Sequence, residues 1–203
     1  RVLRAMSAHI LGQFDPEFTA LMNETMEMER YVFQTKNHQT YLVDTTSRGG
    51  LETVLTGAIC PGDKVLIPAF GRFGYLLAEI LERCGADITL LEKEWGTVFE
   101  PQEIEDALKK DSYKAVACIH GETSTSMMQP LDELGEICEK YGALLIVDAV
   151  ATLGGAEVKV DDWKLSACIS GTQKCISAPS GSALITYNEQ IGEIVRKRKR
   201  VEK

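Results

Sequence analysis

Strand-like and helix-like segments alternate along this chain from about residue 40 onward, and this alternation restricts the fold most. Short apolar runs, such as 64–67 and 115–119, are each followed by a longer segment with helical spacing. Parallel strands need a connection of that length, usually a helix, so the pattern predicts βαβ units with right-handed crossovers. We therefore expect an α/β fold with a mostly parallel seven-stranded sheet covered by helices.

The expected elements divide the chain into three parts: a helical lead-in over 1–39, a large domain over 40–190, and the start of a basic helix over 191–203. Helix and connection are expected over 16–33, and further helices over 47–59, 73–84, 101–110 and 131–141. Expected strands are 40–43, 64–67, 88–91, 115–119, 144–147, 165–169 and 182–187.

Two charged residues follow neighbouring expected strands. Asp148 ends the apolar run 144–147, and Lys174 comes shortly after the run 165–169. Because ligands of such folds bind beyond the carboxyl ends of the strands, an anion and an amine are expected at one edge of the sheet. A pyridoxal phosphate enzyme needs this pair, the lysine for a Schiff base and the aspartate for the pyridine nitrogen.

Three other strand ends carry residues that suit the same cofactor. Hydroxyls and glycines in 44–50 open a helix, where they would cap it or bind a phosphate. An aromatic ring in 68–74 would stack on a flat cofactor or belong to the core. The segment 120–125 places a histidine, a carboxylate and three hydroxyls in six residues, which form either a turn with a cap or a ligand site. Each segment has an ordinary structural explanation, but together they favour pyridoxal 5'-phosphate.

These motifs resemble the class V, fold-type I pyridoxal phosphate aminotransferases over essentially the whole chain. The resemblance rests on Ser-Gly-Thr-Gln-Lys at 170–174, Val-Asp-Ala-Val-Ala-Thr-Leu-Gly-Gly at 147–155 and His-Gly-Glu-Thr-Ser-Thr at 120–125. It is strongest to the alanine/serine–glyoxylate group. Within that group, segments 11–18, 95–99 and 161–163 are similar to the bacterial (S)-ureidoglycine–glyoxylate aminotransferases of purine catabolism.

The resemblance implies a role for each site residue. Lys174 would bind the cofactor covalently and shuttle a proton, and Asp148 would hold the pyridine nitrogen protonated. Phe73 would stack on one face of the ring and Val150 on the other, with Thr123 donating to the phenolic oxygen. The remaining residues would contact the phosphate (Thr46, Ser47, Arg48 and Gln173) or the ureido group of the substrate (Gln13).

The chain departs from the resemblance in two ways. Ser126 stands where many relatives have glycine. Such enzymes also bind the substrate carboxylate with an arginine of a C-terminal small domain, and share phosphate contacts across a homodimer interface. No such domain follows residue 203, so we expect a partial protein, poorly active alone.

Composition excludes some classes of protein. The formal net charge of −8 argues against a nucleic-acid partner, and the basic cluster 196–200 is either a solvated helix face or a polyanion or membrane site. No run is long enough to span a membrane. Six cysteines without metal-like spacing suggest free thiols, hence a cytoplasmic location and no metal.

Two rival functions remain open. A cysteine desulfurase-like lyase of the same superfamily typically has histidine before the lysine, where this chain has Gln173. A non-catalytic α/β module would bind a nucleotide or a protein without using the lysine. Among aminotransferases, (S)-ureidoglycine, alanine and serine all remain possible amino donors.

Overall fold

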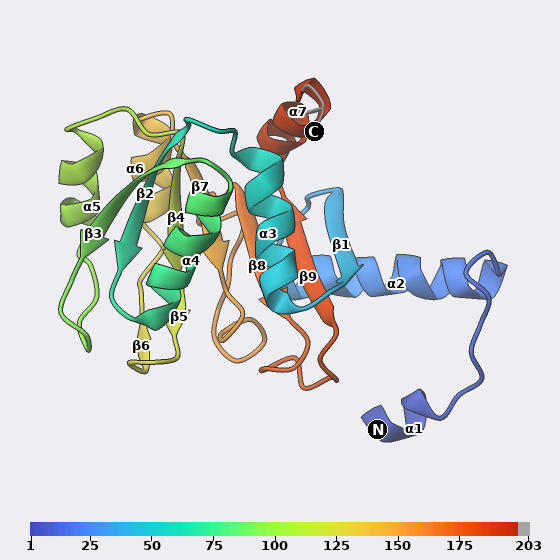
Figure 1. Ribbon diagram of the computed structural model, residues 1–203. Coiled ribbons are helices and arrows are strands. Elements are labelled where there is room, and N and C mark those ends of the chain that lie inside the picture. Colours follow the sequence, from blue (N-terminus) through green and yellow to red (C-terminus); the bar gives the residue numbers. More distant parts are fainter. Residues whose placement is uncertain (199–203) are drawn as a thin grey trace.

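The computed structural model describes residues 1–198, which form a seven-stranded sheet between layers of helices (Figure 1). The strand order is β1-β9-β8-β7-β4-β2-β3. Five central and edge strands, from β8 to β3, run parallel, whereas β9 is antiparallel to both β8 and β1. The strands are β1 (Gln39–Asp44), β2 (Lys64–Ala69), β3 (Asp87–Glu92), β4 (Ala115–Ile119), β7 (Leu144–Asp148), β8 (Ala167–Gly171) and β9 (Ser182–Tyr187). The predicted mostly parallel α/β sheet is confirmed.

Helices cover both faces of the sheet. Figure 1 shows α3 and α4 in front of the strands and α6 behind them. The helices are α1 (Val2–Met6), α2 (Pro16–Phe33), α3 (Ser47–Ala58), α4 (Arg72–Arg83), α5 (Pro101–Leu108), α6 (Leu134–Lys140) and α7 (Glu189–Lys197). Sequence signals explain several starts: Asp15, Thr46 and Asn188 cap α2, α3 and α7 with their side chains, and proline opens α2 and α5.

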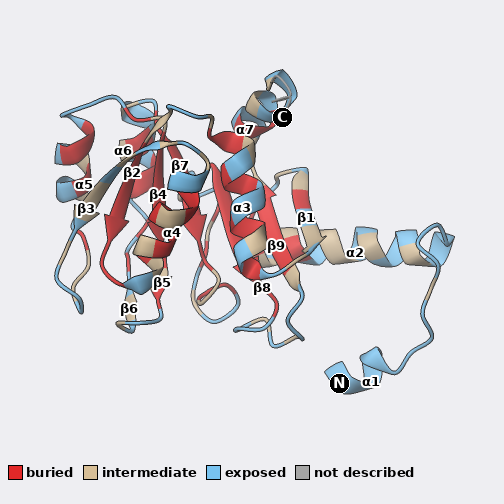
Figure 2. Cartoon of the chain, viewed as in Figure 1, coloured by how far each residue is buried: buried red, intermediate tan, exposed pale blue. Residues whose placement is uncertain are grey.

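The core lies along the middle of the sheet (Figure 2). Every residue of β4, β7 and β8 is buried, as expected for parallel strands covered on both faces. The edge strand β3 alternates instead between exposed and less exposed positions over its first half. Buried polar residues therefore stand out where these apolar central strands end.

Most predicted elements agree with the structure to within a few residues, including α2 and both β4 and β9. The expected helix over 131–141 begins only at Leu134, and the expected strand over 165–169 begins at Ala167. Two features were not predicted: the short helix α1, and a hairpin of β5 (Gly121–Glu122) and β6 (Met127–Met128). The division into three parts stays a prediction, and the basic cluster 196–200 lies partly outside the described residues.

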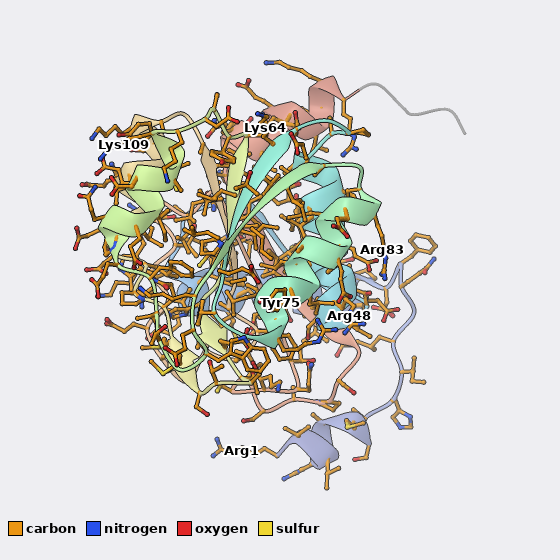
Figure 3. The ribbon with its side chains drawn as sticks, turned by 60° about the vertical axis from the view of Figure 1, so that its left-hand side comes forward. Arg1, Arg48, Lys64, Tyr75, Arg83 and Lys109 are labelled. Atoms are coloured by element: carbon orange, nitrogen blue, oxygen red, sulfur yellow. The ribbon has the colours of Figure 1, made fainter. Side chains whose placement is uncertain are left out.

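The two ends of the sheet are chemically different surfaces. Figure 3 shows Lys64, the first residue of β2, and Lys109, just after α5, at the end of the body remote from Arg1. The other end holds the turns that leave the parallel strands.

Within the part of the chain that the structure describes, no helix has the length and apolarity to cross a membrane.

Candidate active site

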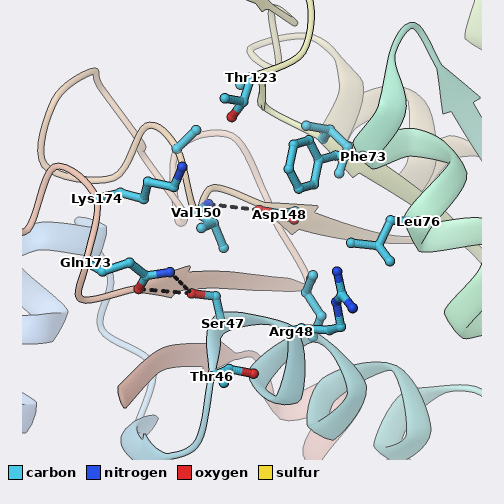
Figure 4. Close-up of a pocket in the computed structure, with 14 residues that line it drawn as sticks. Thr46, Ser47, Arg48, Phe73, Leu76, Thr123, Asp148, Val150, Gln173 and Lys174 are labelled. Atoms are coloured by element: carbon cyan, nitrogen blue, oxygen red, sulfur yellow. Dashed lines mark hydrogen bonds between the residues drawn. The ribbon is translucent and has the colours of Figure 1, made fainter. Parts of the chain in front are cut away.

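A cavity of about 370 Å³ opens at the carboxyl ends of the parallel strands (Figure 4). All nine predicted cofactor and catalytic residues, Lys174 among them, line it from five separate segments. The lining residues are Thr46, Ser47, Arg48, Leu51, Phe73, Leu76, Ile119, Gly121, Thr123, Asp148, Val150, Ala151, Gln173 and Lys174. The fold therefore brings together residues that lie up to 128 positions apart in the sequence.

Asp148 is the charged group at the floor of this cavity. It ends β7, is 7% exposed, and its Oδ1 accepts a hydrogen bond of 2.8 Å from the Val150 N–H. Burial raises its pKa from 3.8 to about 6, and the negative charge of Glu122 adds to the rise, while the Val150 N–H and Lys174 oppose it. A cation facing Asp148 would relieve this unfavourable burial.

Lys174 approaches the cavity from the turn after β8. Backbone hydrogen bonds hold this turn, from Ser177 N–H to the Lys174 carbonyl at 2.9 Å and from Ala178 N–H to the Thr172 carbonyl at 2.9 Å. The Thr172 hydroxyl also donates to the Ser182 carbonyl at 3.1 Å. The backbone is thus fixed, whereas the lysine side chain is exposed and makes no ion pair among the described residues. Its amine is available to a ligand.

The amino end of α3 forms the wall opposite the strand ends. Thr46 caps the helix by accepting from Gly49 N–H at 3.2 Å, so the predicted capping role is observed. The Gln173 amide donates to Ser47 Oγ at 2.9 Å and joins this helix to the lysine turn (Figure 4). The first N–H groups of a helix have no intrahelical acceptor, and here they belong to residues that line the cavity. Such a terminus suits an anion.

Two further walls come from α4 and the β5–β6 hairpin. Phe73, in the first turn of α4, presents its ring to the cavity, and Thr123 lies in the hairpin loop (Figure 4). Phe70, the other ring in that segment, is buried in the core. Ser126 has φ of 58°, in the left-handed region that favours glycine, which accounts for the glycine expected there in relatives.

Some predicted residues and features fall elsewhere. Gln13 is exposed in the segment before α2 and does not line the cavity, so its substrate contact stays a prediction. His120 is buried and does not line the cavity; its Nδ1 lies 2.8 Å from the Thr152 hydroxyl, and burial lowers its pKa to about 4. Leu51, Leu76 and Ile119 line the cavity but were not predicted, because apolar residues there resemble ordinary core.

Comparisons with known proteins place this cavity in context. The family model described as "Aminotransferase class-V" matches residues 4–200. The (S)-ureidoglycine–glyoxylate transaminase of Bacillus subtilis is 59% identical over 203 residues, which are 100% of this chain and 49% of that protein. The alanine–glyoxylate aminotransferase of Rattus norvegicus is 38% identical over 199 residues, which are 98% of this chain and 48% of that protein.

A solved structure agrees with these matches. The crystal structure of the ureidoglycine–glyoxylate aminotransferase from Bacillus subtilis superposes with a TM-score of 0.97 at 58% identity, covering 98% of this chain and 52% of that one. The chain therefore spans about half the length of the relatives it matches.

Proposed function

The chain belongs to the class-V aminotransferases, and on that premise we propose that it forms part of a pyridoxal phosphate-dependent transaminase. The observation that carries this proposal is the meeting of Lys174, Asp148 and the amino end of α3 around one cavity. Class-V aminotransferases depend on pyridoxal 5'-phosphate, so the first question is whether these residues suit that group.

The set of donors and acceptors fits the cofactor. Thr46, Ser47, Arg48 and Gln173 offer hydroxyls, an amide, a guanidinium and helix N–H groups to a phosphate. Asp148 is a buried carboxylate with one protein hydrogen bond, which leaves it able to accept from a protonated ring nitrogen. The Phe73 ring and Val150 provide apolar surfaces for two faces of a flat ring, and Thr123 provides a hydroxyl for its phenolic oxygen. We infer these roles for the residues that line the cavity.

When bound, pyridoxal phosphate supplies an electron sink for the bond that breaks at the amino acid Cα. The protein's part is to attach the group and to move protons. Lys174 would hold the group covalently through its exposed Nζ and would move a proton to and from the substrate Cα. Asp148 would accept a hydrogen bond from the ring nitrogen and so hold it protonated; a charge-assisted hydrogen bond of this kind contributes about 1.5–3 kcal/mol.

For the substrates we propose (S)-ureidoglycine as amino donor and glyoxylate as acceptor, in purine catabolism. Support comes from the 59% identity to the (S)-ureidoglycine–glyoxylate transaminase, against 38% to an alanine–glyoxylate aminotransferase. Gln13 stays the proposed contact to the ureido group. The second candidate is alanine– or serine–glyoxylate transamination, which the more distant relatives favour.

We also propose that the protein is a cytoplasmic homodimer. Among residues 1–198, twelve large hydrophobic residues are exposed, and eight of them lie in residues 2–31, a segment that extends away from the body (Figure 1). A second copy covering this segment would bury them. The six cysteines are free thiols, which suits a reducing compartment.

The test is an absorbance spectrum of the purified chain with pyridoxal phosphate, before and after borohydride. We expect a visible absorbance band that borohydride abolishes. The reduction should also leave the cofactor permanently attached to the protein, which an increase in the mass of the protein would show. Lys174→Ala should lose the attachment, and the surface variant Lys109→Ala should keep it. A folded wild-type chain that shows neither band nor attachment would contradict the proposal. Comparing (S)-ureidoglycine, L-alanine and L-serine as donors to glyoxylate, with glycine as the measured product, then separates the two candidate functions.

A further inference from the structure

Glu122 is a buried carboxylate at the cavity edge to which the proposed function gives no role. It ends the short strand β5, and only 1% of its surface is exposed. Its sequence neighbour Thr123 lines the cavity, but Glu122 itself does not. A buried carboxylate needs partners, so the contacts of this one are informative.

Four hydrogen bonds converge on the two oxygens of Glu122. Oε2 accepts from the backbone N–H of Phe73 at 2.8 Å and of Gly74 at 3.3 Å. Oε1 accepts from Ser124 N–H at 3.0 Å and from Ser124 Oγ at 2.6 Å. The same Ser124 Oγ accepts from Arg72 N–H at 2.9 Å. The hairpin loop thus supplies acceptors for three successive N–H groups that open α4.

The glycine before α4 leaves space for the side chain of Glu122. The residue that precedes α4 is Gly71, which offers no capping side chain. A Cβ at this position would lie 2.3 Å from Glu122 Cγ and 2.5 Å from Cδ, closer than real atoms approach. Glycine and glutamate therefore fit as a pair, and the cap comes from a residue about 50 positions away in the sequence.

Both partners of Glu122 carry a residue that faces the cavity. The α4 turn carries the Phe73 ring, and the hairpin carries Thr123 (Figure 4). We propose that Glu122 is a positioning residue that locks these two walls together and so sets the place of the Phe73 ring against the cofactor. This inference rests on the proposed function, because the position of the ring matters to binding only if pyridoxal phosphate occupies the cavity.

A merely structural cap would act differently from a positioning residue. Removing a cap lowers the stability of the whole domain, whereas removing a positioning contact weakens cofactor binding through Phe73 in a protein that stays folded. The variant Glu122→Gln keeps the size of the side chain but replaces one acceptor oxygen by an NH₂ donor. Glu82→Gln, an exposed position in the last turn of α4, is the matched control.

The first measurement is amide hydrogen exchange without cofactor. We expect the Phe73 and Gly74 amides to exchange roughly tenfold faster in Glu122→Gln, the factor that corresponds to loss of one hydrogen bond to a charged group. Amides of β7 and β8 should exchange as in wild type, and Glu82→Gln should change neither set. Unchanged exchange at Phe73 and Gly74 would overturn the proposal.

The second measurement is the Kd for pyridoxal phosphate, read from absorbance in Glu122→Gln, Phe73→Leu and the double variant. If Glu122 acts through the ring, each single variant weakens binding about tenfold and the double variant is little weaker than either. Fully additive effects, or a Kd unchanged in Glu122→Gln, would overturn it. Should Glu122→Gln not fold, Ser124→Ala removes two bonds of the same cluster, with about threefold weaker binding expected.

The two proposals fail in different ways. If wild type binds pyridoxal phosphate and Glu122→Gln binds it equally well, this inference alone is wrong. If wild type binds no cofactor, the proposed function is wrong, and faster exchange at Phe73 in Glu122→Gln would still support the link between the two walls.

Discussion

At the amino ends of the parallel strands, lysines that reach solvent pair with carboxylates that are at least partly exposed. Lys140 lies 2.6 Å from Glu105 and Lys164 lies 2.8 Å from Glu139, and Lys64 pairs with Asp111. At the carboxyl ends, Asp148 and Glu122 are buried, and their hydrogen bonds come from backbone N–H groups and one hydroxyl. The amino ends of the strands thus carry exposed ion pairs, whereas the carboxyl ends carry buried carboxylates whose hydrogen-bond partners are uncharged.

The difference separates stability from binding. Exposed ion pairs are largely screened by water, so they add little to the free energy of unfolding and do not lower it. A buried carboxylate without a cation lowers stability at neutral pH, and the raised pKa of Asp148 reports that unfavourable burial. The carboxyl end therefore holds a buried charge, Asp148, that the Val150 N–H and Lys174 offset only in part and that a cationic ligand would compensate further. Incomplete compensation of this kind is typical of a binding site and not of a structural surface.

The largest effect is expected for Asp148→Asn in the cofactor-free protein. Because burial raises the pKa of Asp148 from 3.8 to about 6, the folded wild type loses stability as pH rises through that window. At pH 8 the variant should be more stable than wild type, by up to about 3 kcal/mol. Urea unfolding at pH 8 and at pH 4 checks this, since the difference should nearly vanish at the lower pH.

The amino end provides the control for that experiment. Hydrogen bonding to Lys64 lowers the pKa of Asp111, so Asp111→Asn should decrease stability slightly at pH 8. Pyridoxal phosphate should stabilise wild type against urea and stabilise Asp148→Asn much less. If Asp148→Asn instead destabilises the cofactor-free protein at pH 8, the contrast between the two ends is wrong.

Glycines at the two ends should respond in opposite directions to alanine. At the carboxyl end, Gly71→Ala pushes a Cβ against the buried side chain of Glu122, so we expect a loss of roughly 1–3 kcal/mol. At the amino end, a Cβ added to Gly57, in the last turn of α3, would meet only Val195 among residues 1–198, at an ordinary 3.5 Å. Gly57→Ala should therefore stabilise by up to about 1 kcal/mol, through helix propensity. Thermal unfolding of both variants measures the pair, and equal effects would contradict the distinction.

The fold could be predicted from the sequence because each helix or strand is indicated by the pattern of apolar residues within one continuous segment, and most of these segments are several residues long. Strands β4 and β9 were predicted to the residue: β4 is a continuous apolar run, and β9 is a run of apolar and hydroxyl-bearing residues between Gly181 and Asn188. The hairpin β5–β6 was not predicted, because strands of two residues have no periodicity. The start of α6 was placed three residues early, since the apolar Leu131 belongs to a turn that precedes the helix.

The site could be predicted only for residues whose position follows from the order and direction of the strands. Asp148 and Lys174 were assigned to one sheet edge because parallel strands all end there. The hydrogen bonds of Glu122 were not, because its partner Phe73 is 49 residues distant and no local pattern links them. Gln13 shows the opposite limit: its segment lies outside the sheet, so topology says nothing about what it contacts.

The smallest effect is expected at the amino end, for Glu105→Gln. Hydrogen bonds from Lys140, then from Tyr141 and Lys109, lower the pKa of Glu105 from 4.5 to about 2. A lowered carboxyl pKa contributes stability that is present above pH 4.5 and is lost as pH falls toward 2. The variant should therefore melt slightly below wild type at pH 7, and the gap should close at pH 2–3 and in 1 M salt, where the Debye length is about 3 Å. Thermal unfolding of both proteins over that range checks it. A gap that persists in high salt would mean that packing around Glu105, and not charge, distinguishes the amino end from the cavity end.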